Sequence, residues 1–407
     1  MINYLRRTIK AIDEKYCSEG KKLRGLHPLV EAIDTFFFTP DHKTTGTVHV
    51  RDFNYFKRVM ITVILGLIPC ALFGIYNVGY QANLTGTVPC DWHGSILSFI
   101  DKIFPFLHVF RSSNVLGCFV FGLCYYLPVY LVTMVVGLFW EVLFAAIYKH
   151  EVNEGFFVTG FIFPLICPAT VPLWQVTLAI TFGVVIGKEI FGGTGRNFLN
   201  PALVARAFLF FAYSGQITGD KVWVAADGVS KATPLAHAHE GVAGIQQAGY
   251  TMFDAFFGFI PGAVGETSTF CCMLGAIFLI VVGVAPWRIV ASTFVGGLGL
   301  ATVLAHFSAG PESAAALGPL WHFVLGGFAF GAIFMATDPV SAAQSNLGQI
   351  IYGLLVGALI VVVRVYNPAY PEGAMLAILF GNCVAPLIDH FVVESNIRRR
   401  QKRLQAR

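Results

Sequence analysis

NVLGCFVFGLCYYLPVYLVTMVVGLFWEVLFAAI, residues 114–147, is an almost uninterrupted apolar stretch in which Glu141 is the one charged residue. A helix needs about 20 apolar residues to cross the hydrocarbon core of a bilayer. This stretch therefore predicts a membrane helix that is too long for one straight crossing. We expect Pro128 to kink it, or part of it to project beyond the lipid.

The composition of the whole chain agrees with a membrane protein. Hydrophobic residues make up 56% of the 407 positions, charged residues 12%, and the mean hydropathy is +0.68, whereas about a quarter of residues are charged in soluble domains. The N-terminus is basic and polar up to about residue 55, so we expect no cleavable signal peptide. The nine cysteines form no C-x-x-C pair, which argues against a disulfide framework, a haem signature or an iron–sulfur motif.

The apolar segments predict an all-α polytopic membrane protein with about ten transmembrane helices. The third segment is short and interrupted by prolines, and residues 252–264 resemble a half-helix; such breaks are tolerated where protein or water satisfies the freed backbone. The expected spans are 57–79, 114–147, 155–171, 172–191, 197–213, 269–286, 288–306, 319–336, 348–366 and 374–391.

Five spans lie on each side of a polar loop, and the two groups resemble each other. FGVVIGKEIFGG (182–193) and NPALVARAFLFF (200–211) are similar to YGLLVGALIVVV (352–363) and NPAYPEGAMLAILF (367–380). Five spans per unit give two inverted repeats, which place binding sites near the midplane between the halves. The similarity is short and rich in Gly, Asn and Pro, so chance is the alternative.

Positive charge predicts the orientation. Eleven of the 27 Lys and Arg lie at or before Arg58 and six lie after Ile397. With both termini in the cytoplasm, 21 lie inside and only Lys102, Arg111, Lys221 and Lys231 outside, as the positive-inside rule requires. The predicted parts are a cytoplasmic extension (1–56), a first repeat (57–213), a periplasmic loop (214–251), a second repeat (252–391) and a basic cytoplasmic tail (392–407).

Three carboxylates associated with spans are candidates for function, because ionisable groups inside a bilayer are costly. They are Glu141, Asp338 and Asp389, and their oxygens suit a hard cation. Each has the alternative of a helix cap or an ion-pair partner, above all Asp338, which precedes Pro339. We expect Arg206 and Arg364 to be their internal partners.

The loop between the two groups contains DGVSKATPL, residues 227–235. Together with HEVNEGFFVTG (150–160) and FGGTGRNFLNPA (191–202), it resembles the NqrB/RnfD family of sodium-translocating NADH:quinone oxidoreductases and Rnf complexes. The resemblance implies that the phosphate of FMN esterifies the Thr233 hydroxyl, with Asp227 six residues before it. Lys231 departs from the usual glycine, and a solvated turn is the alternative.

The resemblance also implies two further sites. It places non-covalent riboflavin near Arg196, Asn197 and Asn200, in a Gly-rich segment that has no strand around it and so does not fit a Rossmann motif. A tight turn between helices is the alternative there. It places a quinone near Gly137, Leu138 and Trp140, although the family usually has a second glycine at the position of Leu138. The alternative is an interfacial aromatic belt.

The resemblance implies sodium uptake through Glu141, Asp338, Asp389 and Glu31. No nucleotide-binding motif is present, so we expect electrons from partner subunits: a periplasmic FMN subunit and an NADH-oxidising flavin and iron–sulfur subunit. Ubiquinone is the expected acceptor and the bacterial inner membrane the expected location; we expect no metal site and no nucleic-acid partner. The rivals are an Rnf D subunit, which the basic extension disfavours, and a urea- or ammonium-type channel without flavin.

Overall fold

The computed structural model describes residues 56–89, 91–148, 155–217, 223–226, 232–308, 310, 313–367 and 372–405. Within these ranges the chain is helical and contains no strand. The expected cytoplasmic extension, including Glu31, lies outside the described residues apart from its last position, as do Asp227 and Lys231 in the polar loop.

Six helices in the described ranges are long and apolar enough to cross a membrane, and three shorter apolar helices accompany them. The prediction of an all-helical polytopic membrane protein is therefore confirmed. The long helices are α3 (Phe56–Leu84), α5 (Val115–Tyr148), α7 with the turn η4 (Leu173–Val185 and Glu189–Phe191), α14 (Trp287–His306), α17 (Asn346–Tyr366) and α18 (Ala374–Gln405); the shorter ones are α6 (Gly155–Leu165), α8 (Pro201–Ala212) and α13 (Thr269–Val282).

The expected span 319–336 is not one helix. Helix α15 (Pro319–Val324) ends at an extended Leu325, and Gly326 follows with a φ of +59°, a backbone conformation that favours glycine. The chain resumes as α16 (Phe328–Phe330) and a π-helical turn (Gly331–Met335). This segment is thus broken near its middle, a geometry that needs partners for the freed carbonyl groups.

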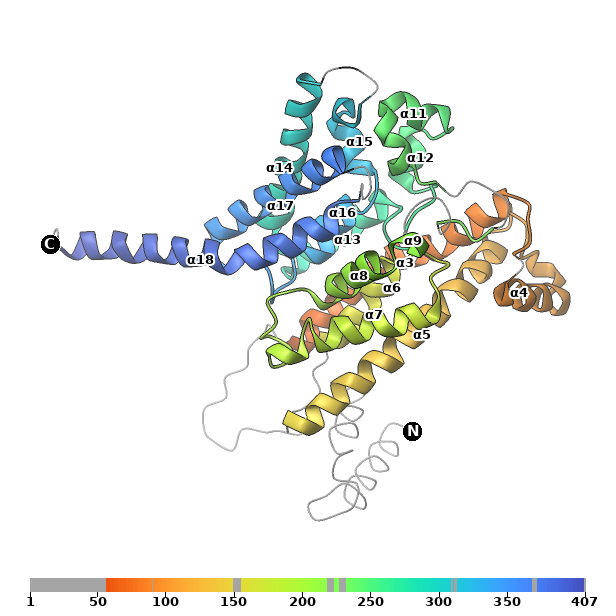
Figure 1. The fold of residues 1–407 in the computed structure, drawn as a ribbon, viewed down its shortest axis with the longest axis horizontal. Helices are drawn as coiled ribbons and strands as arrows, with labels where there is room; N and C mark the ends of the chain where they lie inside the picture. The colour runs from red at the N-terminus through yellow and green to blue at the C-terminus, as the bar shows by residue number, and fades with distance from the viewer. Residues whose placement is uncertain are drawn as a thin grey trace, which may run out of the picture.

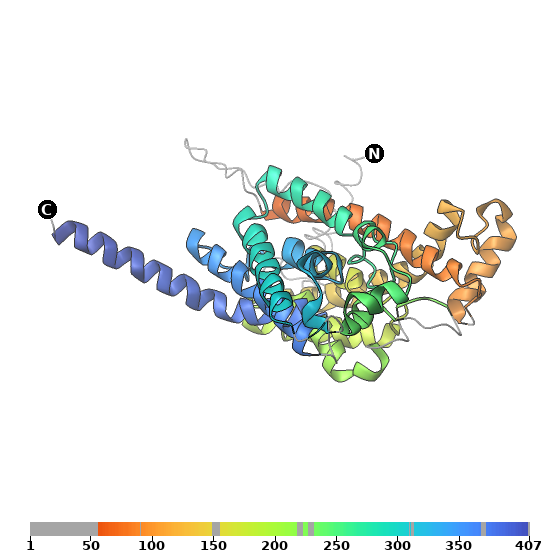
Figure 2. The ribbon, with the colours of Figure 1, turned by 90° about the horizontal axis from the view of Figure 1, so that it is seen from above.

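Helix α5 is continuous through Pro128 from Val115 to Tyr148. Its 34 residues correspond to about 51 Å, against about 30 Å of hydrocarbon. The expectation that part of it projects beyond the lipid therefore fits. Figure 1 shows α5 ending at the bottom of the view and the C-terminal half of α18 extending to the left beyond the other helices, which Figure 2 shows as well.

The helices on either side of the polar loop pack in the same order. Helix α5 packs on α7 and α7 on α8; in the second group α14 packs on α17 and α17 on α18. The corresponding helices α3 and α13 contact each other across the boundary, and so do α8 and α18. This arrangement is the one that two related repeats facing each other would produce.

The polar loop forms α9 (Ser214–Ile217), which packs on α8, and then α10 (Pro234–His237), η5 (Ala238–Glu240) and α11 (Gly241–Gln247). Helix α12 (Met252–Phe257) follows the loop and packs on α13 and α15 of the second group. A separate apolar cluster includes Leu235, Ile245, Ile260, Trp321 and Leu325. This cluster fixes the start of α10 against the broken segment at α15.

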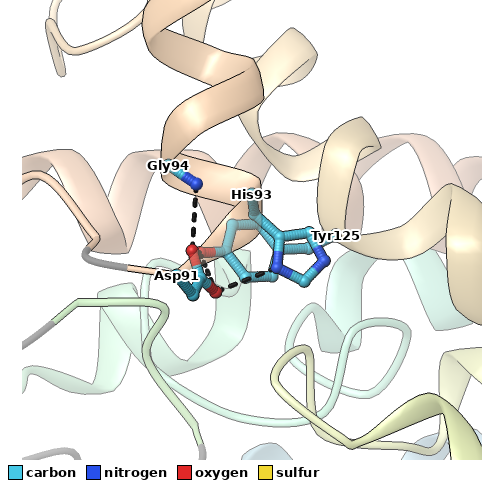
Figure 3. Close-up of polar contacts among 4 residues, drawn as sticks. All are labelled: Asp91, His93, Gly94 and Tyr125. Atoms are coloured by element: carbon cyan, nitrogen blue, oxygen red, sulfur yellow. Dashed lines mark hydrogen bonds and ion pairs between the residues drawn. The ribbon is translucent and has the colours of Figure 1, made fainter.

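Helix α4 (Trp92–Ile103) and the turn η3 (Pro105–Leu107) connect α3 to α5 and lie at the right of Figure 1. Asp91 caps α4 by accepting a hydrogen bond from the Gly94 N–H at 2.9 Å. The same carboxylate accepts the Tyr125 hydroxyl at 3.1 Å and contacts His93 Nδ1 at 2.9 Å, and the His93 ring stacks on Tyr125 (Figure 3). These contacts join the connection to α5.

Candidate functional site

Thr233 lies at the N-terminus of α10, half-buried, with its hydroxyl oxygen accepting the Ala236 N–H at 3.3 Å. The next two residues, Pro234 and Leu235, are buried, so the packing of the loop fixes the position of the threonine. In this contact the hydroxyl oxygen is the acceptor, so the hydroxyl proton takes no part in capping the helix. Thr233 is therefore a positioned and partly exposed hydroxyl.

Thr233 lines a pocket that we call the outer pocket, after the side that the charge pattern predicts. It encloses about 340 Å³ including its open mouth. Its polar side chains are Thr233, Glu266, Thr267 and Glu372, all oxygen-bearing. The remaining lining consists of Pro234, Leu235, Ile260, Pro261, Gly262, Ala263, Leu325 and Gly326.

Two buried arginines satisfy the carbonyl groups that the broken segments expose. Arg206 Nε donates to the Ile166 carbonyl at 3.1 Å, just after α6. Arg364 donates to the His322 and Leu325 carbonyls at 2.7 and 2.6 Å, at the end of α15. Cations near helix C-termini also complement the helix dipole. Each arginine thus supports a half-helix of its own group.

The expectation that Arg206 and Arg364 pair with Glu141, Asp338 or Asp389 is wrong. Arg206 forms an ion pair with Glu372 at 3.8 Å, and Arg364 Nε contacts the Glu372 carbonyl at 3.4 Å. The two guanidinium groups lie close to Glu372 and to the carbonyl groups at the broken segments. The three predicted carboxylates have other partners.

Glu266 and Glu372 are functional candidates that the sequence analysis missed. Glu266 follows the half-helix segment in PGAVGETST, and Glu372 lies in NPAYPEG. A carboxylate in a Gly- and Pro-rich break between apolar spans is a usable signal, because such breaks line cavities. Both residues line the outer pocket and also a smaller middle pocket, whose other lining residues are Ile166, Leu203, Arg206, Gly327, Met335, Ala374 and Met375.

A third and larger pocket, the inner pocket, lies toward the opposite ends of α3 and α13. It encloses about 750 Å³ of space including its open mouth. Its polar lining is Lys188, Thr194, Asn197, Asn200, Thr159, Thr337 and Asp338, and its apolar lining includes Met60, Val63, Val158, Ile162, Leu279 and Phe334.

The inner pocket brings together two of the three residues predicted to contact riboflavin. Asn197 and Asn200 line it and are buried, whereas Arg196 is exposed and does not line it. Asn200 caps α8 with its carbonyl oxygen, which accepts the Ala202 N–H at 3.0 Å. Its amide nitrogen can therefore still serve a ligand.

The polar groups of the inner pocket are of the kind that bind the polar edge of a flavin. The buried Thr194 hydroxyl has no hydrogen-bond partner among the described residues, and such an orphan group points to a missing partner. Amide and hydroxyl groups from Thr194, Asn197 and Asn200 match the polar edge of a flavin, while Ile162 and Phe334 supply an apolar wall.

Glu141 is buried in an ion pair rather than open to a cavity. Lys188 Nζ donates to its carboxylate, and Glu189 lies 3.7 Å from the same ammonium group. All three side chains are at most 4% exposed. Lys188 also lines the inner pocket, so the pair connects Glu141 to that pocket. From the sequence, Lys188 counted only among the positive charges on the cytoplasmic side.

Asp338 and Asp389 differ in surroundings. Asp338 lines the inner pocket while accepting the Ser341 hydroxyl at 2.7 Å and the Val340 N–H at 3.2 Å. Asp389 accepts the N–H groups of Gln344 and Ser345 at 2.7 and 3.0 Å and also bonds the Ser345 hydroxyl. Asp389 thus anchors the start of α17 and lines none of the three described pockets.

The residues predicted to contact quinone do not line the three described pockets either. The ring of Phe156 fills the space beside Gly137, where a Cβ would overlap it. Leu138 is half-buried, and the Trp140 indole donates to the Thr181 hydroxyl at 2.9 Å. These contacts describe a close helix crossing between α5, α6 and α7.

The chain matches the model of the NQR2, RnfD, RnfE family over residues 43–398. It is 53% identical to the NqrB-type subunit of the Na(+)-translocating NADH-quinone reductase of Chromohalobacter salexigens over 395 residues, covering 96% of this chain and 94% of that protein. It is 51% identical to the protein of the same name from Ectopseudomonas mendocina, covering 95% and 96%, and 50% identical to that from Azotobacter vinelandii, covering 95% and 96%. A match of this extent shows that the chain belongs to the NQR2, RnfD, RnfE family.

Proposed function

We propose that this chain is the NqrB component of a Na⁺-translocating NADH-quinone reductase and that it carries FMN on Thr233. The observation that carries the proposal is the placement of Thr233, half-buried in the lining of a pocket between the polar loop and the second helix group. Relatives named as components of that reductase, matched over nearly their full length, support the reductase over the Rnf alternative.

In the proposed attachment, the Thr233 oxygen forms the ester bond to the phosphate of FMN, and water is the other product. The residues of this chain hold that oxygen: Pro234 and Leu235 are packed below it and Ala236 N–H fixes its direction. A bound flavin would supply reversible uptake of electrons there. The polar side chains of the inner pocket support a second, non-covalent flavin, riboflavin, held by Thr194, Asn197 and Asn200.

The remaining assignments follow the family. We propose that electrons come from a periplasmic FMN subunit, which an NADH-oxidising subunit supplies, and that ubiquinone accepts them near Gly137, Leu138 and Trp140. Asp338 is the best supported of the proposed sodium residues because it lines the inner pocket. Glu141 acts through Lys188, whereas Asp389 and Glu31 rest on the resemblance alone. The location is the bacterial inner membrane with both termini in the cytoplasm.

The proposal is tested with two variants in the assembled complex. Thr233→Val keeps the shape of the side chain but removes the ester oxygen, so the protein should lose flavin fluorescence in a denaturing gel and remain in the membrane. Thr251→Val, at a capping threonine outside the outer pocket, should keep the fluorescence. A fluorescent Thr233→Val band would contradict the attachment, and a parent band without flavin would favour a channel.

A second experiment tests the ion residues. Asp338→Asn should raise the half-saturating Na⁺ concentration for quinone reduction while the content of covalent flavin stays unchanged. The matched variant Asp389→Asn should act first on the stability of the α17 start, since that carboxylate is occupied by Gln344 and Ser345. Parent-like Na⁺ dependence in Asp338→Asn would contradict a role of Asp338 in cation uptake.

A further inference from the structure

The outer pocket contains a cluster of oxygen groups that electron transfer does not use. Glu266, Thr267 and Glu372 line it, and no nitrogen-bearing side chain does. Hard cations prefer oxygen ligands from carboxylates, hydroxyls and carbonyls. The chemistry of this lining therefore fits a cation and disfavours an anion.

Thr267 supplies an independent sign of a ligand. The residue is only 4% exposed and its hydroxyl has no hydrogen-bond partner among the described residues, although it lines the pocket. An unsatisfied buried hydroxyl is unfavourable. A ligand that coordinates the hydroxyl oxygen would satisfy it.

The nearby arginines do not occupy the Glu266 carboxylate. Arg364 directs its donors to the carbonyl groups of His322, Leu325 and Glu372. Arg206 pairs with Glu372, and Glu266 takes part in no ion pair among the described residues. Glu266 is instead packed against the turn at Gly327, where a Cβ would lie 2.7 Å from its Oε1. Its carboxyl group thus lines the pocket without an ion-pair partner among the described residues.

We propose that the outer pocket is a Na⁺ site in which Glu266, Thr267 and Glu372 supply the oxygen ligands, next to Thr233. The middle pocket, which Arg206 lines, lies between the outer pocket and the inner pocket. The positive charge of Arg206 opposes passage of a cation from the outer pocket toward the inner pocket. The site therefore exchanges Na⁺ with the side of the membrane that Thr233 faces. The inference rests on the proposed function for the identity of the ion.

The test measures ²²Na⁺ binding to the purified complex by equilibrium dialysis, at constant ionic strength with choline chloride. Glu266→Gln and Thr267→Val remove a charged and a neutral oxygen ligand. Each should abolish one Na⁺ site or weaken it by about tenfold or more. Valine has the same shape as threonine, so Thr267→Val should assemble. It therefore still tests the site if the Glu266→Gln complex does not assemble.

Two controls accompany these variants. Thr267→Ser keeps the hydroxyl, and Glu240→Gln removes an exposed carboxylate of the same loop region; both should bind Na⁺ like the parent. Parent-like binding in Glu266→Gln and Thr267→Val would overturn the site. If Na⁺ binding falls as expected but the parent lacks covalent flavin, the proposed function of Thr233 fails and the cation site stands.

Discussion

Glu141 and Lys188 show how a buried charge is retained in this fold. Removing two charges from water is unfavourable, and their attraction offsets this only when geometry and further hydrogen bonds are good. Here a single ammonium group faces both Glu141 and Glu189. Loss of the lysine would leave two buried carboxylates without that cation.

We predict that Lys188→Met lowers the stability of the folded chain by about 3–5 kcal/mol. Thermal unfolding of the detergent-purified complex, followed through release of this chain, measures the effect. Glu394 and Arg398 form a matched exposed pair, with side chains 41% and 69% exposed. Arg398→Met should change stability by no more than about 1 kcal/mol. Equal losses of stability in the two variants would show that the buried ion pair contributes no more to stability than the exposed pair.

Gly137 tests the helix crossing at the predicted quinone residues. A methyl group there would overlap the Phe156 ring, so Gly137→Ala should force α5 and α6 apart and lower stability by about 1–3 kcal/mol. Gly299, in α14, has no neighbour within 4 Å of an added Cβ, and Gly299→Ala should be neutral or stabilising. The ubiquinone KM of both variants shows whether the crossing also shapes a quinone site; an unaltered stability and KM in Gly137→Ala would contradict this packing.

At the scale of elements, the Asp91 carboxylate caps the start of α4. Burial by itself would raise the pKa of Asp91, but hydrogen bonds from Gly94, His93 and Tyr125 and the attraction of His93 lower it below its ordinary value. A carboxyl group with a lowered folded pKa stabilises the fold above the unfolded pKa of about 3.9, and this contribution is lost as the pH falls through the folded pKa.

We therefore predict that the amides of α4 lose protection from hydrogen exchange below about pH 4, after correction for the intrinsic exchange rate. Asp91→Asn keeps a capping side chain but has no charge to titrate. Its α4 should show weaker protection at neutral pH and no further loss on acidification. An acid transition of the same size in Asp91→Asn would assign the effect to another group.

The elements that sequence predicts well are those with a continuous apolar pattern. Helices α14 and α17 begin and end within two residues of the expected spans, and Asn200 and Pro201 mark the start of α8. The break at Gly326 was not predicted, because two adjacent glycines within an apolar segment give no polar signal. The hydrogen bonds from Arg206 and Arg364 to backbone carbonyls could not be predicted either, because the sequence does not show which carbonyl groups lie near these side chains.

At the scale of the whole molecule, the inner and middle pockets lie between the two helix groups, and the outer pocket follows them between the second group and the polar loop. The inner pocket includes Met60 and Leu279, and the outer pocket includes Thr267, which precedes the start of α13. The middle pocket shares Glu266 and Glu372 with the outer one. The sequence named Thr233, Asn197 and Asn200, which line the outer and inner pockets, as candidates; it did not name Glu266 and Glu372, whose proximity arises only in the fold.

The two ends of this series should face opposite sides of the membrane. We predict that a cysteine at Ala236, beside Thr233, reacts with a membrane-impermeant thiol reagent added to whole cells, whereas one at Arg196, beside the inner pocket, reacts only in everted vesicles. Both positions are exposed, and the remaining cysteines can be replaced by serine or alanine. Labelling of the Arg196 position from outside intact cells would invert the proposed orientation.

The attachment of FMN to Thr233 is tested most directly by mass spectrometry of the protein isolated under denaturing conditions. We predict a peptide containing Thr233 that carries the mass of FMN less one water, with fragment ions that place the addition on Thr233. The same peptide from Thr233→Val should be unmodified. An unmodified Thr233 peptide from the active parent complex, or a flavin located on another residue, would show that Thr233 is not the attachment site.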